Sequence, residues 1–418
     1  MQYNLHKAQQ LDAQDELRNY REKFHFPKQK NGKDYLYFCG NSLGLQPKIT
    51  KEYVDEVMQD WANLAVEGHF YAKHSWMNYH ELFSETLAKI VGAKRNEVVC
   101  MNTLTANLHF LLISFYRPTE KKFKILVESD AFPSDKYVVQ SQARFHGYNP
   151  DETIIYVKPR EGETLLRNED IIELIEKQGD EIALILFGGI NYYTGQFFDL
   201  QKITEEGHKK KCIVGFDLAH AAGNVPLQLN AWNVDFAAWC TYKYMNSGPG
   251  SLGAIYVNEK FLEDKTIPRF EGWWGTNKQT RFNMRLDFDA IPTAESWQVS
   301  NAPILSMAGV RASMSLFEEV GMKKLRQKSK LLTEYLLELL TELPKERINI
   351  ITPKNWDERG CQTSIQVKNA DKTLFYKLLE KGVLGDWREP DVIRISPAPF
   401  YNSFEDCYKL VETLKILL

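Results

Sequence analysis

The chain has 418 residues, of which 44% are hydrophobic and 26% charged, and its formal net charge is −3. This length allows two or three domains, and the composition is ordinary for a soluble globular protein. The small net charge gives no support for nucleic-acid binding, and no uncharged apolar stretch is long enough to span a membrane. The N-terminus lacks the apolar core of a signal peptide, and the six scattered cysteines form no C-x-x-C pair, so we expect reduced thiols in a cytoplasmic protein.

Short apolar runs alternate with amphipathic stretches through the middle of the chain. Continuous rather than alternating hydrophobicity predicts strands that are buried on both faces. The stretches between them, such as 169–178 and 200–211, have helical spacing with one polar face. This succession predicts an α/β fold with a mostly parallel, seven-stranded sheet. The predicted strands are 98–101, 125–128, 154–157, 182–187, 213–216, 236–240 and 252–257.

The pattern changes near residue 302. Pro303 is expected to start a long helix, Gly321 interrupts it, and a second amphipathic helix follows over 325–343. Shorter elements then predict a smaller α+β domain at the C-terminus. They are strands at 348–351, 363–367 and 392–395 and helices at 374–381 and 404–418.

These patterns divide the chain into three parts. An N-terminal segment, 1–60, is expected to pack with the small domain, and Pro47 is predicted to be the first residue of a helix that ends at Leu64. The large domain would comprise 61–302 and the small C-terminal domain 303–418.

Two glycine motifs match known signatures but lie in the wrong context. Residues 248–253 match G-x-G-x-x-G, but a strand follows where a dinucleotide-binding fold would have a helix. Residues 40–44 match the G-x-S-x-G nucleophile elbow, but no helix is expected to begin at Ser42, so we predict a turn there. The histidines within 69–80 match no metal-ligand spacing, and no metal site is predicted.

Lys243 is the residue on which the functional interpretation depends. It follows the apolar run 236–240, and Asp217 and His220 follow the run 213–216. The carboxyl ends of parallel strands meet at one edge of a sheet, so these three side chains should lie together. A lysine for an aldehyde and an aspartate for a pyridine nitrogen are what pyridoxal 5'-phosphate (PLP) requires.

Each of these residues also has an ordinary interpretation. Asp217 could cap a helix at 218–222, His220 could be a packing histidine, and Lys243 could be a solvated loop lysine. Their joint position at strand ends favours the PLP site.

A phosphate group needs hydrogen-bond donors, preferably where a helix begins. Residues 102–107 follow the first predicted strand and open a helix, so their backbone N–H groups and the Thr105 hydroxyl form a candidate anion site. Thr103 or Thr105 could also simply cap that helix. Phe132 lies just past the next strand and could stack on a cofactor ring or belong to the core.

Seven short motifs run in order along the chain from about residue 38. They are 40–44 (GNSLG), 132–135 (FPSD), 193–196 (YTGQ), 216–221 (FDLAHA), 242–250 (YKYMNSGPG), 301–305 (NAPIL) and 399–403 (PFYNS). With these motifs the chain resembles the kynureninase family. The resemblance implies a fold-type I PLP-dependent transferase-like architecture, like that of aspartate aminotransferase, and homodimers with shared active sites. It also implies hydrolysis of L-kynurenine or L-3-hydroxykynurenine to anthranilate or 3-hydroxyanthranilate plus L-alanine, within tryptophan catabolism and NAD biosynthesis.

The resemblance also implies roles for single residues. Lys243 would hold PLP as a Schiff base, Asp217 would bind its pyridine nitrogen, and Phe132 would stack on its ring. Tyr242 is the expected acid that protonates Cβ of the departing alanine. Further cofactor contacts would come from Leu104, Thr105, Pro133, Ser134, Asp135, His220, Tyr193 and Tyr242, and from Trp273 and Asn301 of the partner subunit.

Substrate contacts follow from the same resemblance. Arg394 is expected to bind the substrate carboxylate, because an arginine in an apolar strand needs a partner and its fork fits a carboxylate; a structural ion pair is the alternative. His69, Ser300 and Asn301 resemble aryl-pocket residues of relatives that favour the 3-hydroxylated substrate. One position departs from the pattern, since Gly188 stands where some relatives have serine.

Two other interpretations stay open. An aminotransferase or a cysteine desulfurase would share the fold, but a desulfurase needs a reactive cysteine on a mobile loop, and Cys361 is the only candidate. A PLP-binding protein without catalysis would also keep the fold. The presence of Lys243, Asp217, Tyr242 and Arg394 together argues against it.

Overall fold

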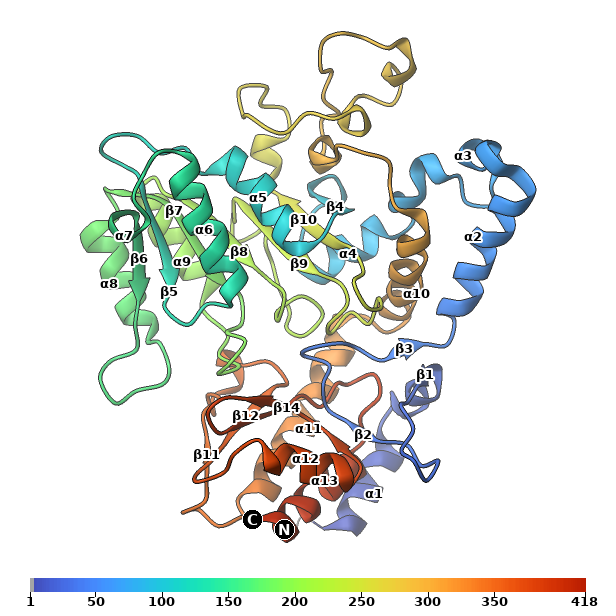
Figure 1. Ribbon diagram of the computed structural model, residues 1–418, viewed down its shortest axis with the longest axis vertical. Helices are drawn as coiled ribbons and strands as arrows, with labels where there is room; N and C mark the ends of the chain where they lie inside the picture. The colour runs from blue at the N-terminus through green and yellow to red at the C-terminus, as the bar shows by residue number, and fades with distance from the viewer. Residues whose placement is uncertain (1–3) are drawn as a thin grey trace.

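The computed structural model describes residues 4–418. A large sheet with helices on both faces fills one body of the molecule, and a smaller sheet with its helices fills a second body, where both chain ends lie (Figure 1). Within the described residues, no helix is long and apolar enough to cross a membrane.

The large sheet has seven strands in the order β4-β10-β9-β8-β7-β5-β6. The strands from β9 to β6 are parallel, whereas β10 is antiparallel to both of its neighbours. The predicted mostly parallel sheet is therefore confirmed. Its strands are β4 (Val98–Met101), β5 (Lys124–Glu128), β6 (Ile154–Val157), β7 (Ile182–Gly188), β8 (Ile213–Asp217), β9 (Phe236–Cys240) and β10 (Gly253–Val257).

Helices cover both faces of this sheet, which explains the continuous apolar runs. Side chains of α5 (Leu104–Phe115) and α6 (Pro133–Phe145) fill the core on one face. The core on the other face is filled from four helices: α4 (Ser84–Val91), α8 (Asn168–Gln178), α9 (Leu200–Lys209) and α10 (Ile304–Val320). A short helix, α7 (Pro150–Thr153), leads into β6.

The small sheet is antiparallel and has the order β11-β12-β15-β14. The helices α11, α12 and α13 pack with it around a separate core, to which α1 also contributes. Strand β14 is an element that the sequence analysis did not predict. The elements are β11 (Ile348–Ile350), β12 (Thr363–Val367), β14 (Asp386–Arg388), β15 (Val392–Ile395), α11 (Met322–Leu340), α12 (Thr373–Glu380), α13 (Phe404–Leu417) and α1 (Leu5–Gln14).

The N-terminal segment contacts both bodies. Strand β2 (Leu36–Tyr37) pairs with β13 (Val383–Leu384) of the small body, and α1 packs against α13. Helix α2 (Thr50–Leu64) instead packs against α10, whose apolar side chains belong to the core of the large sheet. The division at residues 60 and 302 stays a prediction.

The predicted start of the second helix at Pro47 is wrong. Pro47 lies in the short strand β3 (Gln46–Pro47), which pairs with β1 (Phe24–His25), and the helix begins at Thr50. Proline has no N–H to donate, and the edge of a two-stranded ladder tolerates that loss as well as a helix start does. The later helix is as expected, because Pro303 caps α10 and Gly321, with φ +76°, separates α10 from α11.

Gly215 allows β8 and β9 to pack closely just before Asp217. A Cβ at this position would lie 2.2 Å from Cζ of Phe236 on β9, and the Phe236 ring stacks on Phe115 with 5.0 Å between the ring centroids. We therefore expect Gly215→Ala to lower the free energy of unfolding by about 1–3 kcal/mol, because the ring must shift within a packed core.

The measurement is urea unfolding of Gly215→Ala in the native and Phe236→Leu backgrounds. Leucine at position 236 is smaller than phenylalanine, so Gly215→Ala should lower the free energy of unfolding by less in the Phe236→Leu background. An equal loss of unfolding free energy in both backgrounds would show that the Phe236 ring does not clash with the added methyl group.

Candidate active site

A cavity of about 260 Å³ lies at the carboxyl edge of the large sheet. The ends of β5, β7 and β8, the loop after β9 and the start of α5 form most of its wall, and β14 and β15 of the small sheet complete it. The residues that line it are Asn41, Ser42, Thr103, Leu104, Thr105, Glu128, Phe132, Ser134, Asp135, Gly188, Ile190, Tyr192, Asp217, Ala219, His220, Tyr242, Lys243, Arg388 and Arg394.

Lys243 and His220 interact directly in this cavity. Lys243 Nζ lies 2.9 Å from His220 Nε2 and 5.9 Å from the centre of the Phe132 ring. Burial, reinforced by the positive charges of Lys243 and Arg394, lowers the pKa of His220 well below its usual range. The imidazole is therefore neutral, and its hydrogen bond with the lysine amine holds that amine inside the cavity.

The segment 40–44 supports the loop that carries the lysine. Gly44 N donates to Tyr242 O at 2.8 Å, and a Cβ at Gly44 would lie 2.4 Å from Lys243 O. Only glycine permits this approach of two backbones. Ser42 lies in a turn with no helix beginning at it, as predicted, and it forms part of the cavity wall.

Asp217 and Asp135 form a buried carboxyl pair. Ala219 N donates to Asp217 Oδ1 at 2.7 Å. Burial raises the pKa of both acids, and the charge of Asp217 raises the pKa of Asp135 further, well above its usual range. Because two adjacent carboxylates do not both ionise, Asp135 keeps a proton and Asp217 carries the negative charge, which Ala219 N–H and Lys243 stabilise.

Two helix starts supply hydrogen-bond donors to the cavity. Thr103 precedes α5 and makes no side-chain capping bond, so the first N–H groups of that helix have no side-chain acceptor. Phe132 precedes α6, which also lacks a side-chain cap. The hydroxyl groups of Thr103, Thr105 and Ser134 line the same cavity. Helix starts with free N–H groups and nearby hydroxyls bind anions such as a phosphate.

These features fit PLP. The cavity offers an amine for the aldehyde at Lys243, a buried negative charge for the pyridine nitrogen at Asp217 and an anion site at the start of α5. All three groups come from the carboxyl edge of one sheet, which is where ligands bind in folds of this type.

A carboxylate fills the space beside Gly188. Gly188 N donates to Glu128 Oε1 at 3.3 Å, and Asn191 Nδ2 donates to Oε2 at 2.9 Å. A Cβ at position 188 would lie 2.7 Å from Oε1 of Glu128. The space that a side chain at position 188 would enter is therefore occupied by the Glu128 carboxyl group.

Arg394 enters the cavity from the small sheet. It is 1% exposed, Nη1 donates to Tyr192 O at 2.6 Å, and Nη2 pairs with the carboxylate of Asp386. The structural ion pair considered above as the alternative is thus present. Its Nε is nevertheless buried without a hydrogen-bond partner among residues 4–418, so the guanidinium retains a free donor.

Several predicted residues lie outside this cavity. Tyr193 lines a neighbouring cavity of about 310 Å³, which shares Glu128 with the first. Pro133 is the first residue of α6 but is not part of the cavity wall. The other predicted residues lie elsewhere on the large body: Trp273, Ser300 and Asn301 are exposed, and His69 is half-buried.

Other residues of the cavity wall were not predicted from the sequence. Glu128 ends an apolar strand just as Asp217 does, so the same reasoning could have found it. Tyr192 and Arg388 had no comparable signal, because Tyr192 lies in a loop and Arg388 in a strand of three residues with two charged side chains.

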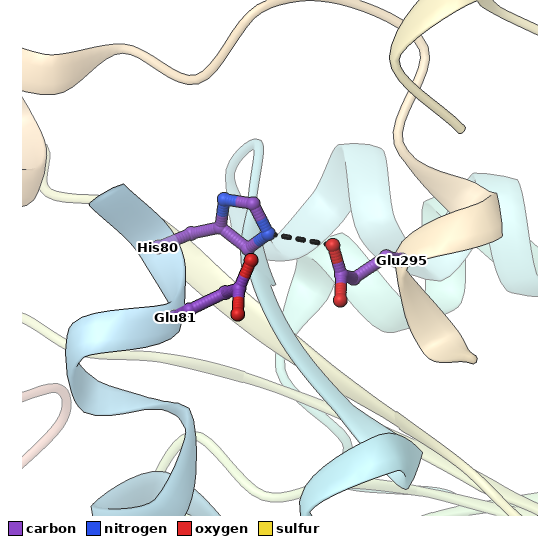
Figure 2. Close-up of side chains that lie close together, drawn as sticks. All are labelled: His80, Glu81 and Glu295. Carbon is purple, nitrogen blue, oxygen red and sulfur yellow. Dashed lines mark hydrogen bonds and ion pairs between the residues drawn. The ribbon is translucent and has the colours of Figure 1, made fainter. Parts of the chain in front are cut away.

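A second cluster of ionisable side chains, His80, Glu81 and Glu295, has the composition of a metal site (Figure 2). His80 Nε2 lies 2.7 Å from Glu295 Oε2, and Lys278 Nζ lies 2.6 Å from Glu81 Oε1 and 2.8 Å from Glu295 Oε2. Burial raises the pKa of Glu295, but His80 and Lys278 outweigh it and lower that pKa to about 2. Because an ammonium group already bridges both carboxylates, the cluster is better explained as an ion-pair network than as a metal site.

Cys361, the candidate for desulfurase chemistry, is fully buried beside β12. Burial raises the pKa of its thiol to about 12, so the reactive thiolate is scarce at neutral pH. This environment is typical of a core cysteine.

Glu128 should make stability depend on pH. Burial raises its pKa from 4.5 to about 7, so the folded protein favours the protonated carboxyl. The resulting stabilisation is present below about pH 4.5 and is lost as the pH rises through 7. Between pH 5 and pH 8, the native chain should therefore lose roughly 2–4 kcal/mol more unfolding free energy than Glu128→Gln.

Urea unfolding of both proteins at several pH values measures this difference. Parallel pH profiles for the native chain and Glu128→Gln would mean that Glu128 is ionised throughout, contrary to this expectation.

Comparisons with known proteins identify the family of this chain. The family model of the kynureninase C-terminal domain matches residues 325–414. The chain is 57% identical to the kynureninase of Flavobacterium psychrophilum, with 99% of this chain and 98% of the relative covered, and 46% identical to that of Nematostella vectensis, with 97% and 92% covered.

Solved structures confirm the fold. A cysteine desulfurase of Thermococcus onnurineus superimposes with a TM-score of 0.76 at 18% identity, covering 92% of this chain and 94% of that chain. A cysteine desulfurase of Escherichia coli gives a TM-score of 0.77 at 16% identity, covering 97% and 98%. These similarities place the chain in fold type I of PLP-dependent enzymes, and its full-length sequence identities show that it belongs to the kynureninase family of PLP-dependent hydrolases.

Proposed function

We propose that the chain hydrolyses the Cβ–Cγ bond of L-kynurenine at this cavity and releases anthranilate and L-alanine. The observation that carries the proposal is the amine of Lys243, held 2.9 Å from a neutral His220 in a cavity that also contains the charged Asp217. PLP bound there would supply an electron-withdrawing ring that stabilises negative charge on the substrate carbon.

Different residues of the chain carry out the proton transfers and support the charges of the reaction. Lys243 removes the α proton as a neutral amine, and the hydrogen bond to His220 holds that amine in position. Asp217 keeps a pyridine nitrogen protonated, and Asp135 supports its charge by retaining its own proton. Burial raises the pKa of Tyr242, so this phenol keeps the proton that it delivers to Cβ of alanine.

The substrate is oriented from the small body. Arg394 provides the cation for the α-carboxylate, and its contact with Tyr192 O fixes it at the edge of the cavity. His69, Ser300 and Asn301 are proposed to favour the 3-hydroxylated substrate, which a comparison of kcat/KM for the two substrates measures.

The six free cysteines support a reducing, cytoplasmic setting, and the reaction would serve tryptophan catabolism and NAD biosynthesis.

We also propose a homodimer, based on one exposed apolar surface of the large body. This surface, called the apolar face, consists of exposed apolar side chains on α2, on α3 (Gly68–Tyr71) and on the segment 270–305. Figure 1 labels both helices. The Phe70 and Phe282 rings meet across it with centroids 6.2 Å apart, and Trp61 and Leu305 line one shallow hollow. Large exposed apolar surfaces commonly mark protein interfaces. The apolar face consists of Trp61, Val66, Phe70, Tyr71, Phe282 and Leu305.

Trp273 and Asn301, which are expected to reach the partner's cavity, and His69, which is expected in the aryl pocket, lie near this face. The ring centroid of Trp273 is 5.5 Å from that of Phe282, and that of His69 is 5.4 Å from that of Trp76, which lines the hollow. Asn301 is exposed two residues before Pro303, which also lines it. Their distance from their own chain's cavity is explained if they complete the cavity of a second copy.

We expect Trp61→Glu to convert a dimer into monomers with greatly reduced kynurenine turnover, because a carboxylate would be buried in an apolar interface. Size-exclusion chromatography with light scattering measures the mass. Ile416→Glu on α13, a site that is 74% exposed and lies on the small body, is the matched control. A native chain that is already monomeric and fully active would refute the dimer.

The proposed activity is tested by incubating the PLP-loaded chain with L-kynurenine and following anthranilate fluorescence. Lys243→Ala should reduce turnover by at least 1,000-fold, because both the covalent attachment and the base are lost. Chromatography should find alanine in equal amount to anthranilate. A keto acid or a persulfide as product would support an aminotransferase or a desulfurase instead.

A further inference from the structure

Two arginines reach the cavity from the same face of the small sheet. Asp386 lies directly opposite Arg394 in the pairing of β14 with β15, and Arg388 follows two residues later on β14. Because side chains alternate along a strand, Asp386 and Arg388 project to the same face. On the opposite face, Trp387 and Ile393 belong to the core of the small body.

One carboxylate serves both guanidinium groups. Arg388 Nη2 lies 3.2 Å from Asp386 Oδ2, and Arg394 Nη2 pairs with the same oxygen. The three side chains together carry one surplus positive charge. A single carboxylate from outside the chain would neutralise this surplus charge.

Both arginines also retain an unused donor. The Nε atoms of Arg388 and Arg394 are buried, and neither has a hydrogen-bond partner within residues 4–418. A buried donor without an acceptor is costly, and a guanidinium binds a carboxylate best when it offers two donors. Both side chains line the cavity, and their guanidinium carbons lie 6.0 and 5.9 Å from the centre of the Tyr192 ring.

We propose that Arg388 is a second ligand of the substrate α-carboxylate and acts with Arg394 as a two-arginine clamp. This proposal deepens the proposed function, since it concerns recognition of the same substrate at the same cavity. Asp386 is a positioning residue in the clamp, because it fixes both guanidinium groups while leaving one positive charge uncompensated. Arg388 is partly exposed, with 36% of its side chain accessible, so it is expected to meet the carboxylate at the entrance.

The test compares two competitive inhibitors that differ only in the carboxylate. These are 4-(2-aminophenyl)-4-oxobutanoate, which carries it, and 1-(2-aminophenyl)butan-1-one, which does not. For the PLP-loaded Arg388→Gln variant, we expect KM for kynurenine and Ki for the acid to rise roughly 10- to 100-fold, as for one charged hydrogen bond. The value of kcat and the Ki of the neutral ketone should change less than about 3-fold.

Three further variants define the outcome. Arg388→Lys keeps the charge but loses the fork, so its loss of acid binding should be smaller than that of Arg388→Gln. Arg394→Lys should show the same selectivity for the acid. Arg160→Gln, which removes a surface arginine paired with Asp170, is the matched control and should leave every constant unchanged.

An unchanged Ki for the acid in Arg388→Gln would overturn the proposal, and so would an equal weakening of both inhibitors, which indicates a purely structural role. Calorimetric titration of both inhibitors into the PLP-loaded protein gives the same comparison without turnover. A native chain that binds the acid selectively through Arg388 but makes no anthranilate would support the clamp while refuting the proposed reaction.

Discussion

A negative charge held away from water organises this site. Asp217 lies at the end of a buried strand and is only 7% exposed, so its ionised form must be stabilised by neighbouring groups. The Ala219 N–H and Lys243 provide this stabilisation, while Asp135 stays protonated and adds no second negative charge. The neutral state of His220 belongs to the same balance, because a further cation among buried groups would be unfavourable. The protonation states of the four side chains are therefore interdependent.

The cavity also depends on how the small body is held against the large one. Side chains of the small body donate hydrogen bonds to the backbone carbonyls of residues 192–194, next to the cavity, and three of these bonds are the shortest. Arg394 Nη1 donates to Tyr192 O at 2.6 Å, Ser364 Oγ to Tyr193 O at 2.5 Å and Thr352 Oγ1 to Thr194 O at 2.6 Å. The loop at residues 192–194 thus fixes Arg394 at the cavity wall. Small displacements between the bodies would move the carboxylate-binding groups relative to the lysine.

The strands of the large sheet were predicted well from the sequence, because the apolar pattern that identifies each strand lies within that strand. Strands covered on both faces are apolar throughout, and each strand could be recognised from its own residues. The polar residues at strand ends followed from the same pattern, since parallel strands end at a common edge. Asp217, His220 and Lys243 were found in this way, and Glu128 would have been found by applying the rule to every strand.

The missed features depend on strand pairing, which the composition of a single segment does not reveal. Strand β14 carries two charged residues in three, so its apolar pattern is weak, and it exists because β15 pairs with it. The pairing of Asp386 with Arg394 is a matter of register that neither segment reveals alone. The error at Pro47 has the same origin, because the partner of β3 lies far away at β1. The position of Trp273 and Asn301 outside their own cavity also follows from the tertiary arrangement.

The contact between Gly188 and Glu128 links the evolution of two strands. A side chain at position 188 would collide with the carboxylate from β5 unless that carboxylate had moved first. The effect of a serine at position 188 therefore depends on how far the Glu128 side chain can move, and a double-mutant cycle of the two positions would measure this coupling.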